Sequence, residues 1–297
     1  MLVGELPSLP GVEHRFVQAG AIRMHVAEAG AGDPVLLLHG WPQHWYCWRH
    51  VIPRLAADHR LLCADLRGFG WSDAPRSSYA KQELADDVIA LLDALELERV
   101  RLVGHDWGAF VAFLAALRAP ERVSELLALS MIHPWAGDSA AKSLRRLAPQ
   151  LARLPLLLYQ PLVATPVLGP LTQRLPPFFD ALFAVSGGSR IWSGEDRDAY
   201  TRVLREPARA EATSRVYRTF LARELPAIAR GRYVTGRLTV PTRLVVGRSD
   251  PVITEASLAG FQAHADDMTV EVIDGGHFLP EEQPDAVAQR IREMRAG

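Results

Sequence analysis

The sequence predicts an α/β fold, in which a mostly parallel sheet carries helices on both faces and a helical insertion interrupts the chain. Three observations predict it. In the first half, short apolar runs alternate with segments of helical periodicity, as parallel strands buried on both faces do. A stretch rich in Pro, Arg, Leu and Ala follows, with helical periodicity and no convincing strand. Buried-strand runs then resume before a closing helix.

The first half supplies the hairpin and most of the sheet. An antiparallel pair of strands is expected over residues 14–20 and 22–29. Buried strands are expected over 34–38, 60–64, 100–103 and 123–130. Helical spacing of apolar residues predicts helices over 45–55, 81–95 and 109–117. Strand and helix therefore alternate, which predicts a parallel sheet with helices on both faces.

The second half contains the insertion and the last strands. Residues 134–235 are predicted to form a helical cap domain, because a long insertion after a sheet strand commonly covers the site at the strand ends. Strands over 238–246 and 268–273 and a helix over 280–295 complete the core. The predicted core is thus formed by 1–133 and 236–297.

Composition and charge limit the possible partners. The chain has 297 residues, of which 48% are hydrophobic and 23% charged, and its net charge is −1. This balance is that of an ordinary soluble protein and gives no reason to expect a nucleic acid or an acidic membrane as partner. Residues 1–16 lack a signal-peptide core, and no apolar run could span a bilayer, so we expect a cytoplasmic location. Cys47 and Cys63 are expected to be buried thiols.

The stretch from Arg101 to Phe110 is the centre of the functional argument. It reads as a strand, a sharp turn and the start of a helix, and Gly104 and Gly108 bracket Asp106 as Gly-x-Asp-x-Gly. This is the pattern of a nucleophile elbow, in which the central residue is exposed on a strained turn above a parallel sheet. The elbow usually holds Ser, whereas here it holds Asp.

Two further residues follow predicted strands. Asp250 comes after the strand that ends near Val246, and His277 comes after the strand that ends near Ile273. Catalytic groups of open α/β sheets gather at the carboxyl ends of strands, and the order nucleophile, acid, His is that of hydrolase triads. Each residue alone could be a turn former, a helix cap or a satisfied polar group, but their order and strand context agree.

At this point the chain resembles the α/β-hydrolase superfamily, and within it the branch of the epoxide hydrolases and haloalkane dehalogenases. The resemblance covers nearly the whole chain. It is carried by four motifs, which are His39-Gly40-Trp41-Pro42, Asp65-Leu66-Arg67-Gly68-Phe69-Gly70-Trp71-Ser72, Gly104-His105-Asp106-Trp107-Gly108 and Gly275-Gly276-His277-Phe278.

The resemblance implies a nucleophilic Asp106, and chemistry explains the choice of a carboxylate. With a reference pKa of about 3.9, a carboxylate is already charged at neutral pH and can attack a saturated carbon to form an ester. His277, oriented by Asp250, would then activate a water that hydrolyses the ester. The backbone N–H groups of Trp41 and Trp107 are the candidate oxyanion-hole donors. His39 and His105 are expected to be structural, and neither a metal nor an organic cofactor is expected.

The leaving group separates the two branches. An epoxide oxygen leaves as a strongly basic alkoxide and needs an acid, which two cap tyrosines supply in the epoxide hydrolases. The insertion offers Tyr159, Tyr200, Tyr217 and Tyr233. Val216-Tyr217-Arg218 resembles the second-tyrosine motif of that family, and Tyr159 is the best candidate for the first.

The alternative is a haloalkane dehalogenase, which holds the halide with N–H donors. Trp107 fits the first donor, but the position that holds Asn in many dehalogenases is Trp41, and the chain contains no Asn. Only a cap tryptophan, Trp135 or Trp192, could serve as the second donor. We therefore predict an epoxide hydrolase, whose partners are a small epoxide and water.

A different function and a possible dimer surface also have to be considered. A noncatalytic binding protein of the hydrolase fold is a more distant alternative, and the intact Asp106, Asp250 and His277 argue against it. The apolar stretch from Leu151 to Leu171 could form a patch for a homodimer.

Overall fold

The computed structural model describes residues 4–135, 158–186, 191–231, 233–253 and 258–295. Its centre is an eight-stranded sheet with the order β1-β2-β4-β3-β5-β6-β7-β8. Only β1, β2 and β4 are joined by antiparallel pairing; every pair from β4 to β8 is parallel. The predicted α/β fold with an N-terminal hairpin is confirmed. The strands are β1 (Val12–Ala19), β2 (Ile22–Ala29), β3 (Asp33–Leu38), β4 (His59–Ala64), β5 (Val100–His105), β6 (Val123–Leu129), β7 (Thr242–Gly247) and β8 (Met268–Ile273).

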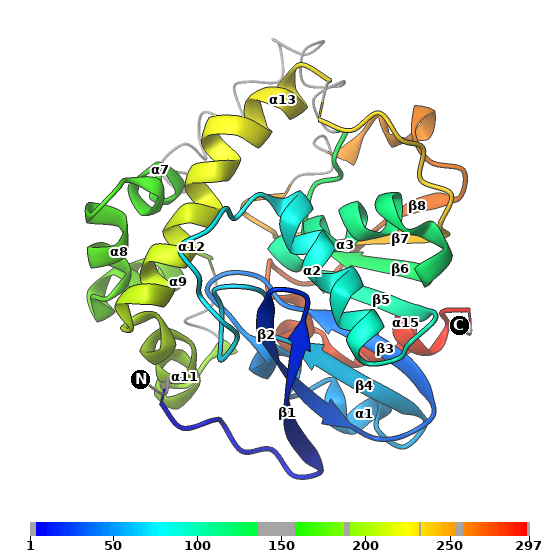
Figure 1. Ribbon diagram of the computed structural model, residues 1–297, viewed down its shortest axis with the longest axis horizontal. Coiled ribbons are helices and arrows are strands. Elements are labelled where there is room, and N and C mark those ends of the chain that lie inside the picture. Colours follow the sequence, from blue (N-terminus) through cyan, green and yellow to red (C-terminus); the bar gives the residue numbers. More distant parts are fainter. Residues whose placement is uncertain (1–3, 136–157, 187–190, 232, 254–257, 296–297) are drawn as a thin grey trace.

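Helices cover both faces of this sheet, as Figure 1 shows. The helices α2 (Lys81–Ala94) and α3 (Trp107–Arg118) lie on one face, and α1 (Ile52–Leu55) and α15 (Pro284–Arg292) lie on the other. Strands β5 and β6 are buried along their whole length, which explains why apolar residues predominate in both without strict alternation. The two cysteines are buried free thiols, as expected.

Three predicted elements differ from the observed ones, each beside a proline. The expected helix over 45–55 is a 3-10 helix, Trp45–Trp48, followed by α1, whose first turn contains Pro53. The expected strand over 238–246 begins only at Thr242, after Pro241. The expected helix over 280–295 is divided at Pro284 into α14 (Leu279–Glu282) and α15. A proline lacks the N–H that a helix or strand ladder needs and restricts the preceding residue.

The named elements in the described part of the insertion between β6 and β7 are all helices, and Figure 1 shows them grouped beside the core. The helix α12 packs against both α7 and α8. The predicted division into core and cap domains stays a prediction, and its residues 136–157, 187–190 and 232 lie outside the described residues. The helices are α7 (Tyr159–Ala164), α8 (Leu168–Gln173), α9 (Pro176–Ser186), α11 (Gly194–Leu204), α12 (Pro207–Thr219), a π-helix (Phe220–Glu224) and α13 (Leu225–Ala229).

The expected dimer patch falls partly on described residues. Leu158, Val167, Leu168 and Leu171 are exposed there, and residues 151–157 lie outside the described residues. The homodimer stays a prediction. Across the part of the chain that the structure describes, no helix has both the length and the apolar character needed to cross a membrane.

Candidate active site

The turn between β5 and α3 holds Asp106 in a strained conformation. Its φ is +50° and its ψ is −124°, a backbone conformation that residues other than glycine rarely adopt. The surrounding glycines allow close approach of three segments. A Cβ atom on Gly108 would lie 2.4 Å from the carbonyl oxygen of Leu38, and one on Gly40 would lie 2.3 Å from Oδ1 of Asp106. The loop after β3 can therefore reach the Asp106 carboxylate only because these positions lack side chains.

Backbone donors surround the Asp106 carboxylate. The N–H of Trp41 donates to its Oδ1 at 2.9 Å. Burial raises the pKa of Asp106, but His277, His105 and the backbone N–H of Trp107 outweigh burial and leave the pKa below its ordinary value. The carboxylate is thus charged at neutral pH. The backbone N–H groups of Trp41 and Trp107, the two predicted oxyanion-hole donors, therefore both stabilise this negative charge.

His277 links the three predicted triad residues. It lies in the loop between β8 and α14 and binds Oδ2 of Asp250 through Nδ1 at 2.9 Å. Its Nε2 lies 3.6 Å from Oδ2 of Asp106. Burial lowers the pKa of His277, but Asp250 and Asp106 together outweigh burial and raise it to about 10. With Asp106 charged, the imidazole is therefore protonated at neutral pH.

The loops around His277 are fixed by further hydrogen bonds. The other oxygen of Asp250, Oδ1, accepts from the N–H groups of Val252 and Ile253 at 2.7 and 2.9 Å. Nε2 of His105 donates to the carbonyl oxygen of His277 at 2.8 Å, since a carbonyl can only accept. His105 thus has the structural position that the sequence predicted.

One carboxylate holds the backbone on both sides of His277. Glu282 accepts from the N–H of Gly276 at 2.6 Å and from the N–H of Phe278 at 2.9 Å. Glu282 is not among the site residues predicted from the sequence. Its position five residues after the His, in the first turn of a helix, is the only signal that could have drawn attention to it.

Two tyrosines of the helical insertion meet beside the elbow. Tyr159 begins α7, Tyr217 lies in α12, and their hydroxyl oxygens are 3.3 Å apart. The ring of Trp41 stacks on Tyr159 with centroids 5.3 Å apart, and the ring of Trp107 meets Tyr217 edge to face at 5.4 Å. Burial, together with the nearby Asp106 charge, raises the pKa of both tyrosines well above the ordinary value. Both hydroxyls therefore keep their protons at neutral pH.

Trp135 and Trp192, the two candidates for a second halide donor, and Trp41, which stands where many dehalogenases have Asn, differ in their contacts. The indole N–H of Trp192 donates to Glu281, and that of Trp41 donates to Oε1 of Gln173 at 3.0 Å. The ring of Trp135 stacks on His264, with centroids 5.2 Å apart. The indole N–H of Trp192 is thus engaged, whereas the buried indole N–H of Trp135 has no hydrogen-bond partner among the described residues.

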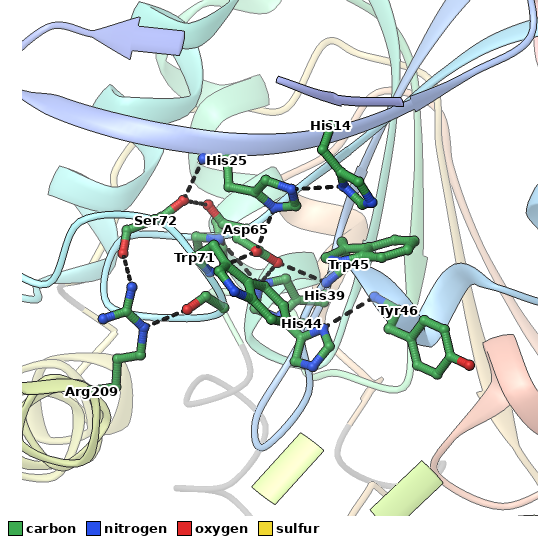
Figure 2. Close-up of polar contacts among 12 residues, drawn as sticks. His14, His25, His39, His44, Trp45, Tyr46, Asp65, Trp71, Ser72 and Arg209 are labelled. Atoms are coloured by element: carbon green, nitrogen blue, oxygen red, sulfur yellow. Dashed lines mark hydrogen bonds and ion pairs between the residues drawn. The ribbon is translucent and has the colours of Figure 1, made fainter. Parts of the chain in front are cut away.

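Asp65 lies among backbone donors and histidine side chains, as Figure 2 shows. Its Oδ1 accepts from the N–H of Trp45 at 2.8 Å, and its Oδ2 accepts from the N–H of Trp71 at 3.0 Å and contacts Nδ1 of His25 at 2.8 Å. Burial raises the pKa of Asp65, but the neighbouring histidines outweigh burial, and the pKa falls well below the ordinary value. A buried carboxylate with this many donors fixes the loops that supply them.

His39 connects this cluster to the loop that carries Trp41. Its Nε2 accepts from the N–H of Leu66 at 3.1 Å, so its Nδ1 carries the proton and donates to the carbonyl oxygen of Gly40 at 2.9 Å. Burial lowers the pKa of His39, which favours this neutral form. The sequence predicted a structural His39, but it did not predict that Asp65 and His39 would act together on the loop of Trp41.

The sequence was compared with known families and proteins. A profile described as the α/β hydrolase fold matches residues 33–284. A soluble epoxide hydrolase from Corynebacterium sp. (strain C12) is 31% identical over 282 residues, which span 93% of this chain and 94% of that protein.

Two solved structures are similar along nearly the full chain. A variant of a proposed epoxide hydrolase from Pseudomonas aeruginosa is 29% identical, with a TM-score of 0.80 and coverage of 97% and 96% of the two chains. A proposed acyltransferase from Salmonella enterica is 27% identical, with a TM-score of 0.83 and coverage of 99% and 98%. The resemblance inferred from the four motifs is confirmed. The chain belongs to the α/β-hydrolase fold family, and it is a hydrolase.

Proposed function

We propose that this hydrolase adds water to an oxirane and gives a vicinal diol, through a covalent ester on Asp106. Proteins of this fold carry different activities, so the choice depends on the site. The observation that carries the proposal is the pair of protonated hydroxyls, Tyr159 and Tyr217, 3.3 Å apart beside the Asp106 elbow. The named epoxide hydrolase from Corynebacterium, similar over 93% of this chain, adds support.

In the first step, a carboxylate oxygen of Asp106 attacks one ring carbon of the epoxide. The carbon–oxygen bond to that carbon breaks, and the ring oxygen takes a proton from Tyr159 or Tyr217. An alkoxide without an acid would be a poor leaving group, because its conjugate acid has a pKa near that of water, about 16. The N–H of Trp41 holds Oδ1, which leaves Oδ2 as the attacking atom. The tyrosinate regains its proton from solvent.

In the second step, water attacks the ester carbonyl of Asp106. His277 takes a proton from that water, and the amides of Trp41 and Trp107 hold the oxyanion. Breakdown of the tetrahedral intermediate releases the second diol oxygen, which takes the proton back from His277. The regenerated Asp106 carboxylic acid then passes its remaining proton to His277, which restores the charged pair of the resting enzyme. The overall change is the addition of one water to one epoxide.

The charge of Asp106 sets the order of these steps. While Asp106 is ionised, its charge contributes to the raised pKa of His277, and a protonated imidazole cannot act as a base. The ester carries no charge, so the pKa of His277 falls once the ester forms. Its proton can then leave to solvent, and the neutral imidazole becomes the base for hydrolysis.

The alternative is a haloalkane dehalogenase with the same nucleophile. It would need a second N–H donor for the halide, and the chain has no Asn. The indole N–H groups of Trp41 and Trp192 already bind Gln173 and Glu281, which leaves the indole N–H of Trp135 as the remaining candidate. The tyrosine pair has no corresponding task in halide release, because a halide ion needs no proton.

A direct comparison of substrates tests the proposal. The purified protein is incubated with styrene oxide and, separately, with a panel of short bromoalkanes, while diol and bromide are measured. We expect diol from the epoxide. Release of bromide without any diol would replace the proposal with the dehalogenase. A protein inactive on both, with intact folding, would favour the noncatalytic alternative.

A further inference from the structure

The side chain of Gln173 joins the oxyanion-hole loop to the cap. It is almost wholly buried at the end of α8. Its Oε1 accepts from the indole N–H of Trp41 at 3.0 Å and from the hydroxyl of Thr213 at 2.8 Å. Its Nε2 donates to the carbonyl oxygen of Ala210 at 3.0 Å and to the hydroxyl of Ser214 at 2.8 Å. The hydrogen-bonding capacity of the amide is thus fully used.

The chemistry of the partners requires an amide at this position. An indole N–H can only donate, so it needs the oxygen of residue 173, whereas the Ala210 carbonyl can only accept and needs an N–H. A carboxylate would lack the donor, and an apolar side chain would leave the buried indole N–H without a partner, which is costly. Gln supplies both functions at once, so the orientation of its amide is determined.

Together these contacts form a closed chain that runs from Gln173 through α12 to the two tyrosines and back through Trp41. Gln173 binds α12 at Ala210, Thr213 and Ser214, and Tyr217 lies three residues beyond Ser214 on the same helix. The hydroxyl of Tyr217 meets Tyr159, whose ring stacks on Trp41 in nearly parallel planes, 4° apart. The indole N–H of Trp41 in turn donates to Gln173. Each member is therefore held from two sides.

We propose that Gln173 is a positioning residue that fixes the oxyanion-hole residue Trp41 relative to the two cap tyrosines, acting through the indole N–H. This inference rests on the proposed function for its effect on rate. The Trp41 amide that holds Asp106 and the Trp41 ring that supports Tyr159 belong to one residue, so a single hydrogen bond to its indole aligns both the nucleophile and the acid.

A double-mutant cycle tests this role, since it separates a direct coupling from general damage to the cap. The four proteins are the wild type, Gln173→Leu, Trp41→Phe and the double variant. Single-turnover formation of the ester from styrene oxide is measured in each, with the melting temperature. We expect Gln173→Leu to slow ester formation about tenfold or more, because misplacement by about 1 Å can cost on the order of 100-fold. In the Trp41→Phe background the same change should cost less than about twofold.

A matched control removes another partner of Gln173. Ser214→Ala deletes one hydrogen bond of the amide without touching Trp41, and should leave ester formation near the wild-type rate. Equal losses from Gln173→Leu in both backgrounds, or a loss from Ser214→Ala as large as that from Gln173→Leu, would overturn the proposal and assign Gln173 to cap packing.

A second readout does not depend on turnover. The indole N–H resonance of Trp41, assigned by its disappearance in Trp41→Phe, should shift in Gln173→Leu and stay in place in Ser214→Ala. If the wild type makes no diol but this shift occurs, the proposed function fails while the link between Gln173 and Trp41 stands. An unchanged resonance would contradict the link itself.

Discussion

The Nε2 atom of His277 lies 3.6 Å from Oδ2 of Asp106. The two groups therefore stabilise each other's charge in the resting enzyme. Asp106 keeps a lowered pKa and stays a nucleophile, while His277 keeps a raised pKa and stays a poor base. In the proposed mechanism, formation of the ester removes the charge of Asp106 and so lowers the pKa of His277 for the second step.

Neutralising Asp106 should lower the pKa of His277. In Asp106→Asn we expect the imidazole pKa to fall from about 10 towards the ordinary value, by about a unit or more, because one of its two carboxylate partners is lost. Titration of the His277 ring resonances by NMR measures this change. Asp250→Asn, which removes the other carboxylate, should also lower the value. An unchanged pKa in Asp106→Asn would contradict the proposed order of the steps.

The pair of His277 and Asp106 should make the free energy of unfolding depend on pH. The pKa of His277 is raised above its unfolded value, so its contribution to the free energy of unfolding is fully present below about pH 6.5. It is lost as the pH rises through about 10. Urea unfolding of the wild type should therefore show stability falling over this interval, and the fall should be smaller in Asp106→Asn. Equal slopes in the two proteins would show that the pair is not coupled.

Removal of the cap hydroxyls should slow formation of the ester rather than its breakdown. We expect Tyr217→Phe and Tyr159→Phe each to lower the ester-formation rate about 10- to 100-fold, and the double variant about 1,000-fold or more, as for loss of a general acid. Rapid-quench measurements with styrene oxide separate the two steps. Tyr233→Phe removes a buried cap hydroxyl outside the pair and serves as the control, with a rate near that of the wild type. A double variant that forms ester at the normal rate would exclude a tyrosine acid.

A buried ion pair between core and cap should matter for stability. Nζ of Lys81 lies 2.9 Å from Oε2 of Glu224 and donates to the carbonyl oxygen of Val216 at 2.5 Å. Burial lowers the pKa of Lys81 to about 8, although Glu224 opposes the shift. Lys81→Met leaves the Glu224 carboxylate buried without a counter-charge, which should cost about 3–5 kcal/mol.

The control for that prediction removes both charges. In Lys81→Met/Glu224→Gln the amide can still accept from the backbone N–H of residue 81, as Oε1 of Glu224 now does at 2.8 Å. Chemical unfolding should show that the double variant regains more than half of the lost stability. A double variant that is no more stable than Lys81→Met would mean that packing, not the unpaired charge, causes the loss.

Much of the fold and the centre of the site could be predicted from the sequence. The elbow needs glycines at positions 104 and 108 because backbone atoms of other residues come within contact distance there. The turn can therefore be predicted from a short, local sequence pattern. Asp250 and His277 follow strands that read as buried runs, and parallel strands bring their carboxyl ends together. The prolines that divide the predicted elements were visible too, but their local effect was underestimated.

What the sequence could not predict depends on contacts between distant segments. Gln173 lies 132 residues from Trp41, and nothing in the local pattern of α8 distinguishes it from a surface Gln. Glu282 reaches the backbone beside His277 only because the chain turns at α14. Lys81 is one of the two lysines in the chain, and in the sequence it looks like an ordinary residue at the start of a helix. Such polar residues are identified by their burial and their partners, which the chain acquires only when it folds.

The central claim is a covalent ester on Asp106, and trapping tests it most directly. His277→Gln should still form the ester but not hydrolyse it, so intact-protein mass spectrometry after incubation with styrene oxide should show an adduct of enzyme plus one epoxide. Peptide mapping should place the adduct on Asp106, and Asp106→Ala should show neither adduct nor diol. Full epoxide turnover by Asp106→Ala, or an active His277→Gln with no adduct at any time point, would contradict the account.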